Sequence, residues 1–263
     1  MGILTMLRLI TLVAAVLFAY SATAKSVLIT GSNRGLGLEF VTQYAAMGWD
    51  VIATSRSPED DDDLQALATA HRNITIEQLD VTDLDGITAL AEKYRSTPID
   101  VLINNAGMFG DRPRQTWGAL DRDLFQQVMD VNVFAPLKIS EAFAPHVAAS
   151  GTKKIAVISS TAGSIASVRN PPGAPYYAIS KAAVNMAMRG AAMRLKKQGI
   201  AVAIFMPGAV DTRMLREAVG LTQEEAEAAT DYDYKRFQPL TTEESISQMI
   251  STLNALSLDQ SGD

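Results

Sequence analysis

The chain has 263 residues, of which 48% are hydrophobic, and its formal net charge is −6. This length suits one α/β domain better than two. The acidic balance predicts no nucleic-acid partner, because a protein that binds phosphate backbones needs a basic face. The absence of cysteine excludes disulfides, thiolate nucleophiles and thiolate zinc sites. The two histidines lie far apart in sequence, so we expect no metal site.

The first 24 residues have the features of a secretory signal peptide. Arg8 is followed by an apolar run over residues 9–19, and Ala22-Thr23-Ala24 fits a cleavage site. The run is shorter than the ~20 residues that a membrane-spanning helix needs. We therefore predict that residues 1–24 are cleaved, that residues 25–263 form the mature domain, and that the protein is exported with no stable membrane span. An uncleaved membrane anchor, a disordered extension of a cytoplasmic protein and a misplaced start codon are the alternatives.

Short apolar segments rich in valine and isoleucine alternate with longer amphipathic segments along the rest of the chain. This alternation is typical of βαβ units, in which helices connect buried parallel strands. It predicts an α/β fold class: a single-domain, Rossmann-type, doubly wound parallel sheet of about six strands, with helices on both faces. The predicted strands are 26–30, 50–55, 74–80, 101–104, 154–159 and 201–206. The longest predicted helices are 35–47, 84–95, 121–149 and 176–197, followed by a more polar helical region from Met214 onward.

A glycine-rich segment follows the first predicted strand directly and opens a helix. Glycines there permit a sharp turn, a close approach of backbone N–H groups to a pyrophosphate, and close packing of the helix on the sheet. A glycine cluster alone could be a plain tight turn, but the strand-to-helix context favours dinucleotide binding. The predicted cofactor-binding residues of this segment are Gly31, Ser32, Asn33, Arg34, Gly35, Leu36 and Gly37.

The end of the second predicted strand bears on which nicotinamide dinucleotide binds. NAD needs a carboxylate there for the ribose 2′-hydroxyl, whereas NADP needs a basic group for the 2′-phosphate. The strand leads into Arg56 without a carboxylate, and Arg34 offers a second guanidinium. We expect NADP(H) to be preferred and NAD(H) to be possible, because the acidic run over residues 59–63 partly offsets the positive field. Asp80 and Val81, which end the third strand, are placed to contact the adenine ring.

Tyr177 and Lys181 are four residues apart on a predicted helix, so both project from one face. A phenol of pKa about 10 is a poor acid near neutrality, and an adjacent ammonium lowers that pKa by stabilising the phenolate. The tyrosine can then deliver a proton to a carbonyl oxygen as hydride reaches the carbon. The same spacing also occurs on exposed helices without any function, so the surrounding motifs decide between the two interpretations.

Several motifs in the same order resemble the short-chain dehydrogenase/reductase family, from about Ser26 to nearly the end of the chain. The residues around Ser160 and Lys181 are most similar to the C-factor and sniffer-type carbonyl reductase branch. Beyond the glycine segment, the matching residues are Asn104, Asn105, Ala106, Gly107, Asn132, Ser159, Ser160, Tyr177, Lys181, Pro207, Gly208 and Thr212.

The resemblance implies NADP-dependent reduction of an aldehyde or ketone to an alcohol. It implies that Tyr177 donates the proton and that Ser160 polarises the substrate carbonyl. It further implies that Lys181 lowers the pKa of Tyr177 and holds the nicotinamide ribose, while Asn132 supports a water relay to Lys181. Further cofactor contacts implied by the resemblance are Asn104, Asn105, Ala106, Gly107, Pro207, Gly208, Val210 and Thr212.

Two segments depart from the family pattern. Residues 169–173 are richer in turn-forming residues than a minimal connection needs, and we expect them either to shape the substrate mouth or to form a surface loop without a role. Residues 256–262 resemble the approach to a final edge strand that relatives possess, yet the chain stops at Asp263. We therefore expect the seventh strand to be missing, which leaves the protection of the sheet edge and a homo-oligomer open.

Three functions are compatible with the sequence. The first is an NADP-dependent reductase of a small or medium apolar aldehyde or ketone. The second is a non-catalytic dinucleotide-binding sensor, against which the intact polar catalytic set argues. The third is a 3-oxoacyl thioester reductase, for which we find no basic strip to hold an acidic carrier. Pocket candidates, which are equally suited to the core, are Met108, Phe109, Met206, Met214 and Leu215.

Overall fold

The computed structural model describes residues 24–168, 173–221, 225 and 238–262. The predicted signal peptide lies outside these ranges except for Ala24, and so does most of the turn-rich segment over residues 169–173. None of the helices in the described ranges combines the length and apolar character needed to cross a membrane. The first strand begins at Ser26, as predicted.

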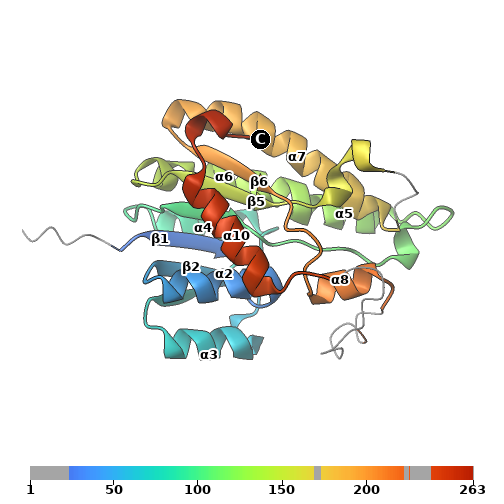
Figure 1. Cartoon of the computed structure of the whole chain (residues 1–263), viewed down its shortest axis with the longest axis horizontal. Coiled ribbons are helices and arrows are strands. Elements are labelled where there is room, and N and C mark those ends of the chain that lie inside the picture. The colour runs from blue at the N-terminus through green and yellow to red at the C-terminus, as the bar shows by residue number, and fades with distance from the viewer. Residues whose placement is uncertain (1–23, 169–172, 222–224, 226–237, 263) are drawn as a thin grey trace, which may run out of the picture.

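Parallel strands form one six-stranded sheet with the order β3-β2-β1-β4-β5-β6 (Figure 1). This order confirms the predicted fold class, and every strand ends within two residues of its expected limit. The connection reverses direction between β1 and β4, which is the point where open α/β sheets bind ligands. The strands are β1 (Ser26–Thr30), β2 (Asp50–Ser55), β3 (Ile74–Gln78), β4 (Val101–Asn104), β5 (Lys154–Ile158) and β6 (Ala201–Phe205).

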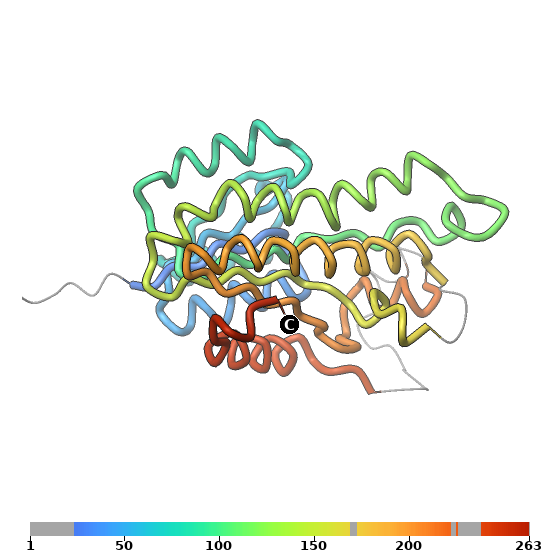
Figure 2. The backbone as a smooth tube through the Cα atoms, turned by 90° about the horizontal axis from the view of Figure 1, so that it is seen from above, coloured from blue at the N-terminus to red at the C-terminus, as the bar shows by residue number. Residues whose placement is uncertain are grey.

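Helices cover both faces of the sheet, and Figure 2 shows α6 and α7 running side by side on one of them. The first three strands and the first three helices alternate along the chain, as the βαβ pattern requires. The helices are α2 (Gly35–Ala46), α3 (Asp62–Ala70), α4 (Leu84–Lys93), α5 (Arg122–Met129), α6 (Ala135–Ala148), α7 (Pro175–Leu195), α8 (Arg213–Ala218) and α10 (Thr242–Ala255).

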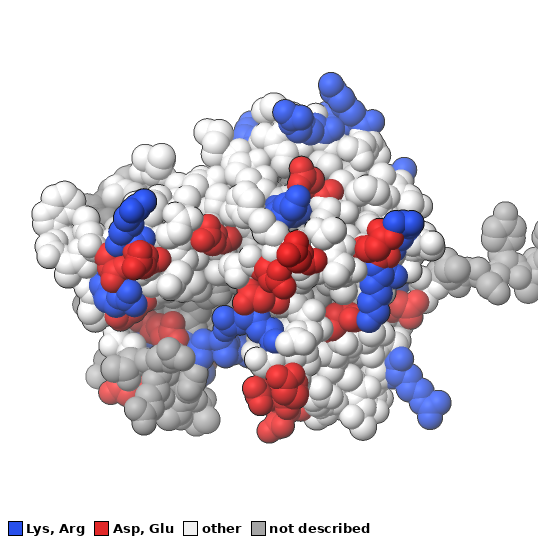
Figure 3. Space-filling view, turned by 180° about the vertical axis from the view of Figure 1, so that it is seen from behind, with Lys and Arg blue, Asp and Glu red and all other residues white. Residues whose placement is uncertain are grey.

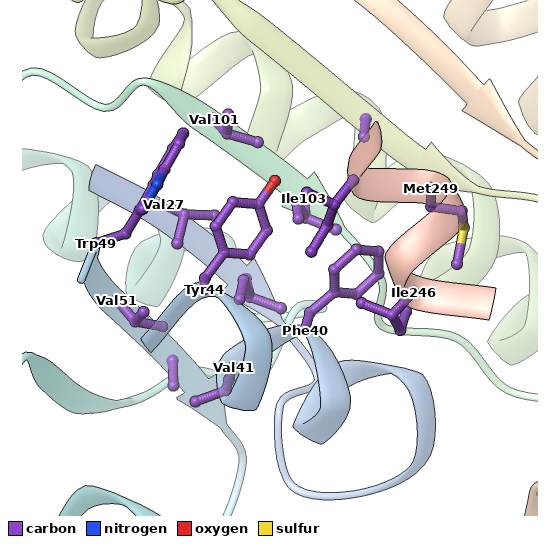
Figure 4. Close-up of a cluster of buried hydrophobic side chains, with 14 of the residues drawn as sticks. Val27, Phe40, Val41, Tyr44, Trp49, Val51, Val101, Ile103, Ile246 and Met249 are labelled. Carbon is purple, nitrogen blue, oxygen red and sulfur yellow. The ribbon is translucent and has the colours of Figure 1, made fainter. Parts of the chain in front are cut away.

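Two apolar cores lie on opposite faces of the sheet because successive strand residues point to opposite sides. Val27 packs with Phe40 and Tyr44 of α2 and with Ile246 of α10 (Figure 4). Leu28, the next residue of β1, belongs to the other core, which α4, α6 and α7 cover. Both cores hold the strand ends in fixed positions, so the loops that follow the strands start from a rigid base.

The helix predicted over residues 121–149 is not continuous. It is interrupted by a π-helical segment, η3 (Asp130–Phe134), between α5 and α6. Such segments occur often at functional sites, and they are not visible in hydrophobic periodicity. Here the segment contains Asn132, whose side chain is almost completely buried.

The C-terminal residues lie along the outer edge of β6. The Gly262 amide donates a hydrogen bond to the Val202 carbonyl oxygen over 2.9 Å, and the Val202 amide donates to Ser261 Oγ over 3.0 Å. Among the described residues no seventh strand joins the sheet. The short 3-10 turn η7 (Leu258–Gln260) leads into these bonds and partly covers an edge that would otherwise be open.

Charged side chains of both signs are interspersed over the face shown in Figure 3. This distribution agrees with the modest net charge of −6. The face in this view has no large area of a single sign that would attract a polyelectrolyte.

Candidate active site

A cavity of about 1880 Å³ lies at the carboxyl ends of the strands, and segments that follow all six strands line it. It is larger than the roughly 300–1,000 Å³ typical of small-ligand pockets, so it has room for an extended ligand and a second, smaller molecule. The predicted site residues that line it are Gly31, Asn33, Arg34, Gly35, Leu36, Gly37, Arg56, Asp80, Val81, Asn105, Ala106, Gly107, Ser160, Tyr177, Lys181, Pro207, Gly208, Val210 and Thr212.

The glycine segment is packed too closely to accept side chains. Gly31 has a φ of +66°, and a Cβ there would lie 2.9 Å from Ala106 Cα. A Cβ on Gly37 would overlap the Gly31 carbonyl oxygen. The loops after β1 and β4 therefore meet backbone to backbone, which leaves their polar groups facing the cavity without intervening side chains.

Asn105 fastens these two loops together. Its Nδ2 donates hydrogen bonds to the carbonyl oxygens of Thr30 and Gly31, both over 2.9 Å. Its backbone amide donates to Thr30 Oγ1 over 3.0 Å. The conformation of the glycine turn is thus set by β4 as well as by its own sequence.

Two predicted cofactor contacts do not reach the cavity. Ser32 is fully buried, and its Oγ donates to the Ile29 carbonyl oxygen over 2.9 Å. Asn104 is also buried, and its Nδ2 donates to Ser140 Oγ over 3.1 Å. Ser32 Oγ and Asn104 Nδ2 thus bond inside the protein and hold the turn and the sheet in place.

A carboxylate from the acidic run over residues 59–63 lies near the end of β2. Asp61, six residues beyond the strand, accepts hydrogen bonds from Ser55 Oγ and, over 3.0 Å, from Asn33 Nδ2. It lines the cavity together with Arg34 and Arg56. This region therefore has two guanidinium groups and one carboxylate from the acidic run that was expected to offset their field.

Asp80 also faces this end of the cavity. Burial raises its pKa, but hydrogen bonds from the backbone and side chain of Thr82 and the charge of Arg56 outweigh that effect, so the pKa lies below its ordinary value. The Thr82 amide and hydroxyl donate to Asp80 Oδ1 over 2.8 and 2.7 Å. Asp80 is thus held as an anion near Arg56 at this end of the cavity.

Ser160, Tyr177 and Lys181 meet at the other end of the cavity. Lys181 is buried on α7, and its Nζ donates to the Ile158 carbonyl oxygen over 2.8 Å and lies 5.5 Å from the centre of the Tyr177 ring. Burial lowers the pKa of Lys181 to about 8. Burial raises the pKa of Tyr177, and the Ser160 hydroxyl opposes this shift as a hydrogen-bonding partner.

This direction differs from the expectation that Lys181 lowers the pKa of Tyr177. Loss of solvent disfavours the phenolate more than the neighbouring groups of the protein favour it. The phenol therefore holds its proton at neutral pH.

Asn132 lies behind the cavity wall rather than in it. Its Oδ1 accepts from the Met108 amide, and its Nδ2 donates to the Met108 carbonyl oxygen, both over 2.8 Å. Nδ2 also donates to Ser180 Oγ over 2.9 Å. A Cβ on Gly107 would lie 3.4 Å from Asn132 Oδ1 and 3.7 Å from Lys181 Nζ. Both side chains therefore lie close to Gly107, in the loop after β4. A water relay through Asn132 stays a prediction.

The loop after β4 contributes the pocket candidate Phe109 and a further residue, Gln115, that belongs to no sequence motif. Phe109 packs against Tyr177 with ring centroids 5.0 Å apart. Gln115 is fully buried; its Nε2 donates to the Phe109 carbonyl oxygen over 3.2 Å, and its Oε1 accepts from the Tyr176 amide over 3.0 Å. Gln115 thus attaches the loop to the first turn of α7. No periodicity marks such a residue, because its role depends on segments 61 positions apart.

Four of the five apolar pocket candidates line the cavity. Met206 is half exposed and does not line the cavity. The four that line it are Met108, Phe109, Met214 and Leu215.

Comparison with known proteins agrees with this geometry. A family model described as short chain dehydrogenase matches residues 25–221. The short-chain dehydrogenase/reductase atnB of Arthrinium sp. is 30% identical over 251 residues, which cover 89% of this chain and 94% of that protein.

Solved structures with the same fold include two carbonyl reductases. The NADPH-bound carbonyl reductase from chicken fatty liver has a TM-score of 0.76 and 33% identity, and the match covers 91% of this chain and 94% of that one. The carbonyl reductase Sniffer of D. melanogaster has a TM-score of 0.72 and 27% identity, covering 91% and 95%. The chain is therefore a member of the short-chain dehydrogenase/reductase family of oxidoreductases.

Proposed function

We propose that this protein reduces an aldehyde or ketone to an alcohol, using hydride from NADPH and a proton from Tyr177. The observation that carries the proposal is the meeting of Ser160, Tyr177 and Lys181 in the same cavity as the glycine turn. A hydride donor held at the turn and an acid held on α7 can then act on one carbonyl group.

The residues of the cavity fit a phosphorylated dinucleotide. The turn at Gly31 and Gly37 leaves no room for a Cβ, so backbone groups and the N-terminus of α2 are available to a pyrophosphate. Arg34 and Arg56 line the end where a 2′-phosphate would lie. NADPH bound there supplies the hydride. The similar chicken enzyme was solved with NADPH.

The chain's own residues supply the acid chemistry. The buried Tyr177 keeps its phenol protonated at neutral pH, because its pKa is raised, and it can donate that proton to the carbonyl oxygen as the carbon accepts hydride. The Ser160 hydroxyl polarises the same oxygen. Lys181, fixed by the Ile158 carbonyl oxygen, places a positive charge beside the ring, and this charge favours loss of the proton in the transition state.

The test is turnover by residues 25–263 with NADPH or NADH against aldehydes, ketones, diketones and oxoacyl thioesters. The proposal expects oxidation of NADPH with an aldehyde or ketone, and a higher kcat/KM for NADPH than for NADH. Binding of NADPH without turnover of any carbonyl compound would contradict it, and turnover restricted to thioesters would assign a different substrate class.

A further inference from the structure

The cavity contains an arginine that the proposed reaction does not use. Arg112 lies between β4 and α5, directly before the 3-10 turn η2 (Pro113–Gln115). It is half-buried and lines the same cavity as Ser160 and Tyr177. Its guanidinium lies close to Gly173, two residues before the start of α7, and therefore at the end of the cavity where Tyr177 lies.

The other arginines at this end of the cavity are paired. Arg213 forms an ion pair with Glu217 at 3.3 Å, and Arg216 forms one with Asp211 at 2.9 Å. In the part of the chain that the structure describes, the guanidinium of Arg112 has neither an ion pair nor a hydrogen bond. A partly desolvated cation without an acceptor is unfavourable, so a ligand that brings an anionic acceptor is favoured.

The neighbouring carboxylate of Asp111 does not fill this role. It is exposed, and its charge acts on Arg114. Arg114 itself is bound by Asp121, to which its Nη2 and Nε donate over 2.7 and 2.9 Å. The two arginines of this loop therefore differ: Arg114 is satisfied within the protein, and Arg112 is not.

Two glycines lie close to the guanidinium of Arg112. A Cβ on Gly173 would lie 3.1 Å from its Nη2, and a Cβ on Gly220 would lie 3.4 Å from its Nη1. Because neither position carries a side chain, neither glycine covers the terminal nitrogens with side-chain atoms. Two parallel N–H donors match the two oxygens of a carboxylate.

The loop that carries Arg112 has a fixed position relative to the proton donor. Gln115 ties the Phe109 carbonyl oxygen to the amide of Tyr176, the residue before Tyr177. Arg112 lies within this tied segment. A substrate held by its anionic end at Arg112 is therefore presented at a defined separation from the Tyr177 hydroxyl.

We propose that Arg112 binds a carboxylate of the substrate, so that the enzyme acts on carbonyl compounds with a carboxylate separated from the carbonyl group by apolar atoms. This assignment rests on the proposed function, because it names the substrate class of that same site. The apolar spacer follows from Phe109, Met214 and Leu215, which line the same cavity as Arg112.

The test compares two aldehydes that differ only in charge, 4-carboxybenzaldehyde and its methyl ester, with wild type and Arg112→Met. A charge-assisted bidentate pair predicts that the variant loses about 10- to 100-fold in kcat/KM for the carboxylate. The same variant should change kcat/KM for the ester by less than about 2-fold. Equal losses for the two aldehydes, or no loss for the carboxylate, would overturn the proposal.

Arg114→Met is the matched control, because Arg114 lies on the same loop but is bound by Asp121 outside the cavity. It should leave the ratio between the two aldehydes unchanged. If wild type reduces no carbonyl compound, the proposed function fails, and calorimetric titration with benzoate tests Arg112 separately. Binding at least about 10-fold weaker in Arg112→Met then supports the anion site, and equal affinities exclude it.

Discussion

The two ends of the cavity are built in different ways. At the cofactor end (residues 30–37, 55–61 and 104–107), the loops after β1 and β4 meet backbone to backbone, and added Cβ atoms would collide with main-chain atoms. At the substrate end (residues 108–121 and 213–221), side chains form the wall and hold it in place. Binding of a common cofactor therefore depends on backbone shape, whereas selection of a substrate depends on individual side chains. Each prediction below tests one side of this difference.

The largest effect is expected from Gly37→Ala. The added methyl group would overlap the Gly31 carbonyl oxygen, and backbone rather than a flexible side chain would have to move. We expect a loss of at least about 3 kcal/mol in the free energy of unfolding and no detectable NADPH binding. Urea unfolding and NADPH fluorescence measure the two quantities.

Gly190→Ala is the matched control for that variant. Gly190 lies in α7, and a Cβ there has nothing within 4 Å. Alanine should stabilise the helix by up to about 1 kcal/mol and leave NADPH binding intact. Similar behaviour of the two variants would show that the close packing of the glycine turn is unimportant.

Lys181 lies where the two ends meet, and its burial makes stability depend on pH. Its pKa is lowered to about 8 in the folded protein from an ordinary value of 10.5, so between these values the unfolded chain binds more protons. The free energy of unfolding should therefore rise by roughly 3 kcal/mol between pH 8 and 10.5, and the penalty for the buried charge should persist below pH 8.

The comparison with Lys181→Met isolates this effect from other titrating groups. The difference in the free energy of unfolding, wild type minus variant, should be nearly constant below about pH 8 and increase from there when urea unfolding is repeated from pH 7 to 10. A difference that does not change with pH would mean that Lys181 has an ordinary pKa.

Gln115→Ala tests the substrate end. The change leaves the Phe109 carbonyl oxygen and the Tyr176 amide without their buried partner, and we expect about 2 kcal/mol of destabilisation and roughly a 10-fold lower kcat. The dissociation constant for NADPH should stay the same, because Gln115 is not part of the cofactor end.

The exposed Gln126, whose Nε2 donates to Asp130 Oδ1 over 2.7 Å, provides the control. Gln126→Ala should change stability by less than about 0.5 kcal/mol. A loss of NADPH binding in Gln115→Ala, in proportion to its loss of kcat, would argue for a general structural role instead.

The smallest effect is expected from Asp61→Asn. The carboxylate lies beside Arg34 and Arg56 on the cavity wall and reduces their attraction for a 2′-phosphate. Replacing it with an amide should raise the ratio of kcat/KM for NADPH to that for NADH about 3- to 10-fold, as expected for one charge near solvent. Asp63→Asn, on the exposed side of α3, should leave the ratio unchanged, and a lower ratio in Asp61→Asn would contradict this account.

Sequence patterns predicted the cofactor end best because its signals are local. The alternation of apolar runs and helices gave the sheet, and the run from Gly31 to Gly37 marked the turn, since close backbone packing demands glycine wherever it occurs. The same patterns could not tell that Ser32 and Asn104 turn their polar groups into the protein. That distinction depends on their partners Ile29 and Ser140, which only the folded chain brings near.

The substrate end was less predictable because its determinants are long-range. Asn132 was singled out by its motif, but its place in a π-helical segment and its bonds to Met108 and Ser180 were not predicted. Gln115 and Arg112 belong to no motif or periodic pattern. Their roles become visible only when the loop after β4 is placed against α7, and the same holds for the raised pKa of Tyr177, which burial controls.

The central claim is that Tyr177 protonates a carbonyl next to a bound NADPH. The most direct test mixes the enzyme–NADPH complex with 4-carboxybenzaldehyde and follows a single turnover of NADPH in wild type and in Tyr177→Phe. We predict that the variant binds NADPH normally and transfers hydride roughly 100- to 10,000-fold more slowly, as expected for loss of a general acid. Equal rates in the two proteins would show that the proton comes from another group and would contradict this account.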